Sequence, residues 1–126
     1  NSVDPIVRVR ALELAQSKLD EVLVRKFAEN TPAGGIPACG SFDFNPDPAL
    51  RACTAIQGVA ADPARDDVGD YHNESTTDGG YTVAVAVSEQ GTELGLASDA
   101  MARRVTVTVT MPEAVTLTLS GYKVNF

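Results

Sequence analysis

The chain has 126 residues, of which 44% are hydrophobic and 21% are charged. These proportions are ordinary for one globular domain over residues 1–126, and they exclude a disordered or collagen-like chain. Ten Lys and Arg against seventeen Asp and Glu give a net charge of −7. Such an acidic surface repels phosphates and disfavours nucleic acid as a partner. With one His and no Trp, the composition predicts a protein that is not an enzyme and has no small-molecule substrate.

The first predicted element is a helix over residues 4–29. Asp4 suits the N-cap and Pro5 suits the first helical position. Apolar residues then recur at steps of three and four, which places them along one stripe: Leu12, Ala15, Leu19, Val22, Leu23 and Phe27. A helix of this length exceeds the usual helix of a small domain. The turn-forming residues 30–35 end it.

The predicted middle segment, residues 30–80, is a long irregular loop region without a sustained period. Loops of this length are unusual in a compact domain unless they are functional or cross-linked. Cys39 and Cys53 would close a loop of about 15 residues. We expect a disulfide there, and hence an oxidising compartment. The alternative is a pair of free thiols in a reducing compartment.

The last predicted segment, residues 81–126, is an antiparallel sheet. Apolar residues alternate with Thr or Ala along three stretches, 81–87, 105–111 and 115–119, as in strands with one buried face. Residues 111–114 are short enough for a hairpin turn. After Gly121 the alternation shifts by one residue, which predicts a β-bulge or a bend there. The sheet must bury its apolar face, and the long helix is the one partner large enough, so we expect an α+β fold.

Candidate sites are few. Asp66, Asp67 and Asp70 form the densest acidic group and are candidate calcium ligands, since calcium takes oxygen ligands. The competing interpretation is a turn in which these carboxylates bind backbone N–H groups. His72 is a conceivable general base, with Ser41, Ser75 or a thiol as the nucleophile, but no catalytic motif surrounds any of them. No other cofactor is predicted.

The predicted elements follow one another as a long N-terminal helix, a variable middle and a C-terminal antiparallel meander. This order is the layout of type IV pilins. Within that family the chain resembles the minor pilins of the mannose-sensitive haemagglutinin (MSHA) pilus, of the MshD type. Short segments in matching order carry the resemblance over nearly the whole chain: residues 4–11, 13–16, 19–23, 29–32, 34–39, 65–72 and the closing 121–126.

This resemblance implies a pilin-like fold and a structural role in priming or in the tip complex of a pilus. It also implies an apolar membrane helix and a prepilin peptidase site preceding Asn1. The expected location is the inner membrane facing the periplasm, and later the extracellular pilus of a Gram-negative bacterium. The expected partners are other minor and major pilins, with Asp66, Asp67 and Tyr71 as candidate contacts. The alternatives are a pseudopilin of type II secretion and a calcium-dependent adhesive module.

Overall fold

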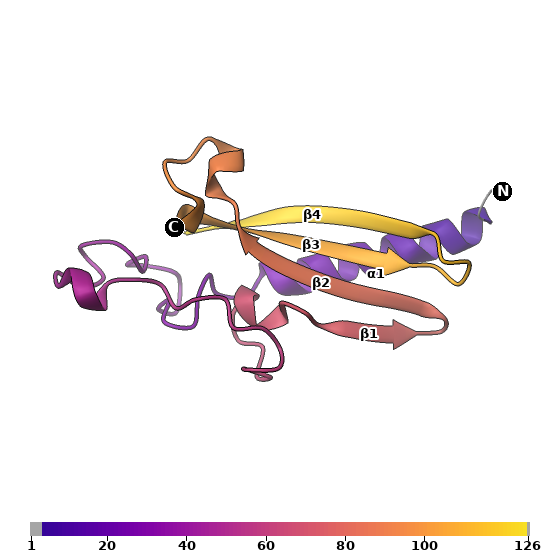
Figure 1. Cartoon of the computed structure of the whole chain (residues 1–126), viewed down its shortest axis with the longest axis horizontal. Coiled ribbons are helices and arrows are strands. Elements are labelled where there is room, and N and C mark those ends of the chain that lie inside the picture. The colour runs from indigo at the N-terminus through magenta and orange to yellow at the C-terminus, as the bar shows by residue number, and fades with distance from the viewer. Residues whose placement is uncertain (1–3, 126) are drawn as a thin grey trace.

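The computed structural model describes residues 4–125. One helix, α1 (Pro5–Leu23), precedes four strands, β1 (Ser75–Asp78), β2 (Tyr81–Glu89), β3 (Ala102–Thr110) and β4 (Thr116–Val124). The strands form an antiparallel sheet in the order β1-β2-β3-β4. Figure 1 shows α1 lying along one face of this sheet, where it packs mainly against β3 and β4. The predicted α+β class is therefore confirmed.

Short 3-10 helices interrupt the segments between these elements. They are η1 (Pro48–Leu50), η2 (Val68–Tyr71), η3 (Gly91–Leu94) and η4 (Asp99–Met101). The segment from α1 to β1 has no other regular element, as the sequence predicted for most of residues 30–80. In Figure 1 this segment extends away from the sheet, at the end of the molecule opposite to the N-terminal end of α1.

The start of α1 and most of its predicted apolar stripe agree with the sequence, but the end of the helix does not. Asp4 accepts a hydrogen bond from the N–H of Ile6 at 2.8 Å, as an N-cap does. The helix ends at Leu23 rather than at residue 29, and Lys123 of β4 donates to the Leu23 carbonyl at 3.1 Å. The residues beyond it turn away from the helix axis, so Phe27 is buried outside the helix.

Within α1, the predicted stripe residues Ala15, Leu19, Val22 and Leu23 face the core, whereas Leu12 does not. Ala11, Ala15 and Val22 are fully buried, whereas Leu12 remains 37% exposed. The two alanines lie against the sheet, where their small side chains permit close packing. Leu12 instead lies at the edge of the contact.

Two predictions for the sheet are wrong. β1 lies within the segment predicted as loop, because Ser75–Asp78 pairs with the start of β2. There is no β-bulge at Gly121, since the β3–β4 pairing is continuous from Thr116 to Val124. A Cβ atom at Gly121 would lie 2.9 Å from Leu23 Cδ1, so this glycine makes room for α1. Tyr122 accordingly lies on the opposite face, where its hydroxyl donates to Glu93 at 2.7 Å.

The main core lies between α1 and the inner face of the sheet. It contains the alternating valines of β2 and β3 together with residues of α1 and η2: Ala11, Ala15, Val22, Val68, Tyr71, Val83, Val85, Val87, Val105, Val107, Val109 and Met111. The predicted turn at residues 111–114 joins β3 to β4, with the N–H of Met111 bound to the Val115 carbonyl at 2.7 Å.

A second, smaller cluster lies under the irregular segment. Phe27, Ala28 and Cys39 are buried there, with Phe44 and Cys53 packed beside them. Cys39 and Cys53 form the predicted disulfide, with a Cα–Cα distance of 5.0 Å. Asn125 donates to the Cys39 carbonyl at 2.7 Å, which holds the residue after β4 against the disulfide loop, residues 39–53.

The predicted domain, residues 1–126, includes residues 1–3 and Phe126, which lie outside the described residues. Phe126 is also the last residue of the closing segment 121–126. Of the helices within residues 4–125, none has both the length and the apolar character needed to cross a membrane.

Candidate functional site

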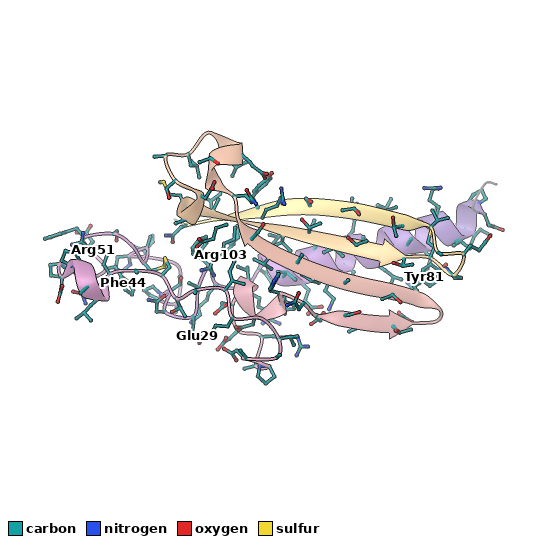
Figure 2. All side chains as sticks on the ribbon, in the orientation of Figure 1. Glu29, Phe44, Arg51, Tyr81 and Arg103 are labelled. Atoms are coloured by element: carbon teal, nitrogen blue, oxygen red, sulfur yellow. A yellow bond between two sulfur atoms is a disulfide. The ribbon has the colours of Figure 1, made fainter. Side chains whose placement is uncertain are left out.

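Four carboxylates gather where the irregular segment meets the sheet. One carboxylate oxygen from each of Glu29, Asp62, Asp66 and Asp70 lies within 4.8 Å of the others. We call these four residues the carboxylate cluster. Figure 2 shows Glu29 near this junction, below the labelled Arg103. The cluster contains oxygen ligands alone, the type that a hard cation such as calcium prefers.

Local backbone structure assembles the cluster. The N–H of Val68 donates to the Lys26 carbonyl at 2.9 Å, which brings the chain after α1 beside η2. Asp67 and Asp70 form a reciprocal capping box at the start of η2. Asp70 Oδ2 accepts from the N–H groups of Asp66 and Asp67 at 2.9 and 3.1 Å, and Asp67 Oδ1 accepts from the N–H of Asp70 at 3.1 Å. The turn expected from the sequence is therefore present.

The close carboxylates alter one another's protonation. A hydrogen bond with Asp62, then burial and the proximity of Asp66, raise the pKa of Glu29 to about 7. Burial and the neighbouring Asp66 raise the pKa of Asp70 to about 7. The pKa of Asp66 is lowered, chiefly because its carboxylate accepts a hydrogen bond from the Asp70 carboxyl. The cluster therefore holds protons near neutral pH, since carboxylates this close cannot all ionise freely.

The structure separates the predicted site residues. Asp66 and Asp70 join the carboxylate cluster, but Asp67 does not. Asp67 is 3% exposed and Tyr71 is fully buried, so neither offers its side chain to a partner protein. The Tyr71 hydroxyl instead accepts a hydrogen bond from Arg25 Nε at 3.1 Å. Of the three candidate contacts, Asp66 alone is exposed.

The residues weighed as catalytic have other partners. His72 Nδ1 accepts a hydrogen bond from the N–H of Val87 at 2.9 Å, which fixes the ring against β2. Ser41 Oγ lies in the disulfide loop, where it bonds the Ala38 carbonyl. Ser75 begins β1 and pairs with Ala84. The structure thus places Ser41 and Ser75 in different elements.

An ion network around the buried Glu74, the residue before β1, joins α1 to the irregular segment. Glu74 is 4% exposed and contacts Lys18 Nζ at 2.8 Å and Arg65 Nε at 2.5 Å. Although burial acts to raise it, the hydrogen bonds from Lys18 and Arg65 hold the pKa of Glu74 below its usual value. Both cations come from the chain itself, so the carboxylate of Glu74 is already paired.

Sequence reasoning missed three important residues. Glu29 and Asp62 belong to the carboxylate cluster but lie 33 positions apart in the chain, and no local spacing connects them. Arg103 is 1% exposed, although a charged side chain is rarely buried to this extent. The one available signal was positional: Arg103 occupies the place in the β3 alternation where the valines point inward.

A second candidate surface lies on the first turns of α1. Ile6, Val9 and Leu12 are 79%, 57% and 37% exposed, and their spacing of three residues places them along one side of the helix. We call these three residues the α1 ridge. A run of exposed apolar side chains on a helix is typical of a surface that contacts protein.

Comparison with protein-family models, with curated proteins and with solved structures finds no match for this chain. The functional assignment therefore depends on the residues and their geometry.

Proposed function

We propose that this chain is a structural subunit of a pilus, a minor pilin of the MSHA type, which acts in priming or at the tip without catalysing a reaction. The observation that carries the proposal is the α1 ridge. Its apolar side chains increase in exposure toward the N-terminal end of α1, from 37% at Leu12 to 79% at Ile6. A helix that served its own core alone would carry polar residues there.

The layout of the molecule supports the same role. α1 reaches the end of the sheet at the β3–β4 turn, so its N-terminal turns are available to other subunits (Figure 1). In the proposed protein this end continues into the inner membrane, and the sheet and the disulfide loop face the periplasm. The Cys39–Cys53 disulfide suits that oxidising location. Other minor and major pilins are the proposed partners.

The first test is the sequence encoded upstream of Asn1. The proposal expects a short basic leader, a Gly at the cleavage position and an apolar helix starting with Phe or Met. An upstream region that encodes a different soluble domain would exclude the proposal.

The second test separates the pilin from the pseudopilin of type II secretion, which shares the proposed fold. Deleting the gene in its bacterium should reduce the number of surface pili seen by electron microscopy and leave protein secretion intact. Complementation with the intact gene should restore the pili. Normal pili with defective secretion would favour the pseudopilin instead.

A further inference from the structure

An open groove lies at the end of the molecule opposite to the α1 ridge. It has a volume of about 650 Å³ and runs between the disulfide loop and η4. Apolar side chains contribute much of its lining, among them Ala38, Pro48, Ala52 and Met101, beside the Cys39–Cys53 disulfide. In Figure 2 the groove residue Arg51 is labelled at this far end. We call this surface the loop groove.

The surroundings of the loop groove expose further apolar surface. Phe42 is 66% exposed and Leu50 is 64% exposed, both within the disulfide loop, and Met101 is 43% exposed on η4. Solvent-exposed side chains of this size, next to an apolar groove, are the arrangement found where another protein binds.

The α1 ridge has the shape that such a groove accepts. Hydrophobic grooves bind helices through apolar side chains spaced three or four residues apart. Ile6, Val9 and Leu12 have this spacing, and they are exposed on the same chain.

One charge beside each surface complements the other, while the cation in the groove, Arg51, donates to the carbonyls of Asn45 and Pro46. Arg8 is exposed and lies one helical turn before Leu12, beside the ridge. Glu89 is exposed and lines the loop groove. Within residues 4–125, the ion pairs include neither side chain. Each can therefore pair with the other across a contact, which offsets part of the repulsion between two chains of net charge −7.

We infer that the α1 ridge of one copy docks into the loop groove of a second copy of this chain. The two surfaces lie at opposite ends of the long axis of the molecule, so the contact joins unlike surfaces of the two copies (Figure 1). Contacts of this kind extend into rings or filaments. The inference rests on the proposed function for its biological setting, because it names a partner for the assembly role.

The experiment is sedimentation equilibrium of the 126-residue chain from about 10 μM to 1 mM, a range that detects weak association. The average mass of the unaltered protein should rise with concentration. Val9→Glu in the ridge and Ala52→Glu in the groove should each weaken association about tenfold or more, because each buries a charge. Both positions are exposed, so the fold should persist, which circular dichroism checks.

Mixing the two variants gives the decisive result. The Val9→Glu protein keeps an intact groove and the Ala52→Glu protein keeps an intact ridge. An equimolar mixture should therefore form a complex of one copy of each and nothing larger. Ser17→Glu, an exposed change on α1 away from the ridge, should associate like the unaltered protein.

Two outcomes would overturn the inference. One is an unaltered protein that stays monomeric up to about 1 mM. The other is a mixture that forms no complex although the unaltered protein associates, because the mixture still contains an intact ridge and an intact groove. Either result leaves the proposed function standing if gene deletion still removes pili, so the two failures can be distinguished.

Discussion

Arg103 of β3 donates from Nη1 to the carbonyl oxygen of Phe27 at 2.7 Å, across 76 positions of the chain. Its Nη2 donates to the Thr54 carbonyl at 2.6 Å, and its guanidinium lies 4.6 Å from the centre of the Phe27 ring. One buried side chain therefore fastens two parts of the irregular segment to the sheet. The segment that forms the carboxylate cluster and the disulfide loop depends on this attachment.

Replacing Arg103 by Met should destabilise the protein by about 2–4 kcal/mol, because it leaves the carbonyls of Phe27 and Thr54 without their donor. The matched control is Arg104→Met in the next position, whose guanidinium pairs with Glu93 near the surface. That change should cost less than about 1 kcal/mol. Urea unfolding followed by circular dichroism measures both. Equal effects of the two variants would contradict the structural role assigned to Arg103.

Replacing Gly121 by Val should cost about 1–3 kcal/mol, because a side chain there meets Leu23 and Leu19 of α1. Ser120→Val on the open face of the sheet is the control and should change stability by less than about 0.5 kcal/mol. Thermal melts of the two variants give the comparison. If Gly121→Val were as stable as the unaltered protein, α1 would not lie as close to β4 as described.

The carboxylate cluster predicts that stability falls as the pH rises toward neutrality. Folding raises the pKa of Glu29 from 4.5 to about 7 and that of Asp70 from 3.8 to about 7. Between these values the folded protein binds more protons than the unfolded chain, so the free energy of unfolding decreases with pH. Folding lowers the pKa values of Asp66 and Glu74. The ionised carboxylates of these two residues therefore stabilise the fold, and this stabilisation is lost only when acidic solution protonates them.

Melting temperatures across about pH 5 to 8 measure this effect. Glu29→Gln imitates the protonated carboxyl and should flatten the dependence of the melting temperature on pH, whereas Glu13→Gln on the exposed side of α1 should not.

Binding of calcium to the carboxylate cluster is the competing outcome. A rise in melting temperature with calcium at alkaline pH, reversed by a chelator and absent in Glu29→Gln, would favour the calcium hypothesis. Its ligands would then include Glu29 and Asp62 rather than Asp67.

Removing the disulfide should cost about 3 kcal/mol, since it closes a loop of about 15 residues in the unfolded chain. The double change Cys39→Ser and Cys53→Ser tests this by urea unfolding. A reducing agent should lower the stability of the unaltered protein to the same level and leave the double variant unchanged. Insensitivity of the unaltered protein to reduction would contradict this stabilising role.

Local patterns predicted the elements that depend on neighbours in the chain. The cap at Asp4 and the start of α1, the alternation of β2 and β3, and the turn at residues 111–114 each involve residues within a few positions of one another. The disulfide was also predictable, because two cysteines permit one pairing within the chain. The strand β1 was missed because its four residues, Ser75–Asp78, are all exposed and show no apolar alternation.

Composition and local periodicity were enough to predict the class of the molecule: one amphipathic helix, an antiparallel sheet and a cross-linked irregular segment, on an acidic chain. The end of α1 at Leu23 depends on tertiary packing. So does the role of Gly121, whose missing side chain leaves room for Leu23 and does not mark a bulge. The meeting of Glu29 and Asp62 with Asp66 and Asp70 is likewise a result of packing. Packing also buries Asp67, Tyr71 and Arg103. Hydrophobic period and turn chemistry are local, whereas burial and the meeting of distant carboxylates depend on how the elements pack.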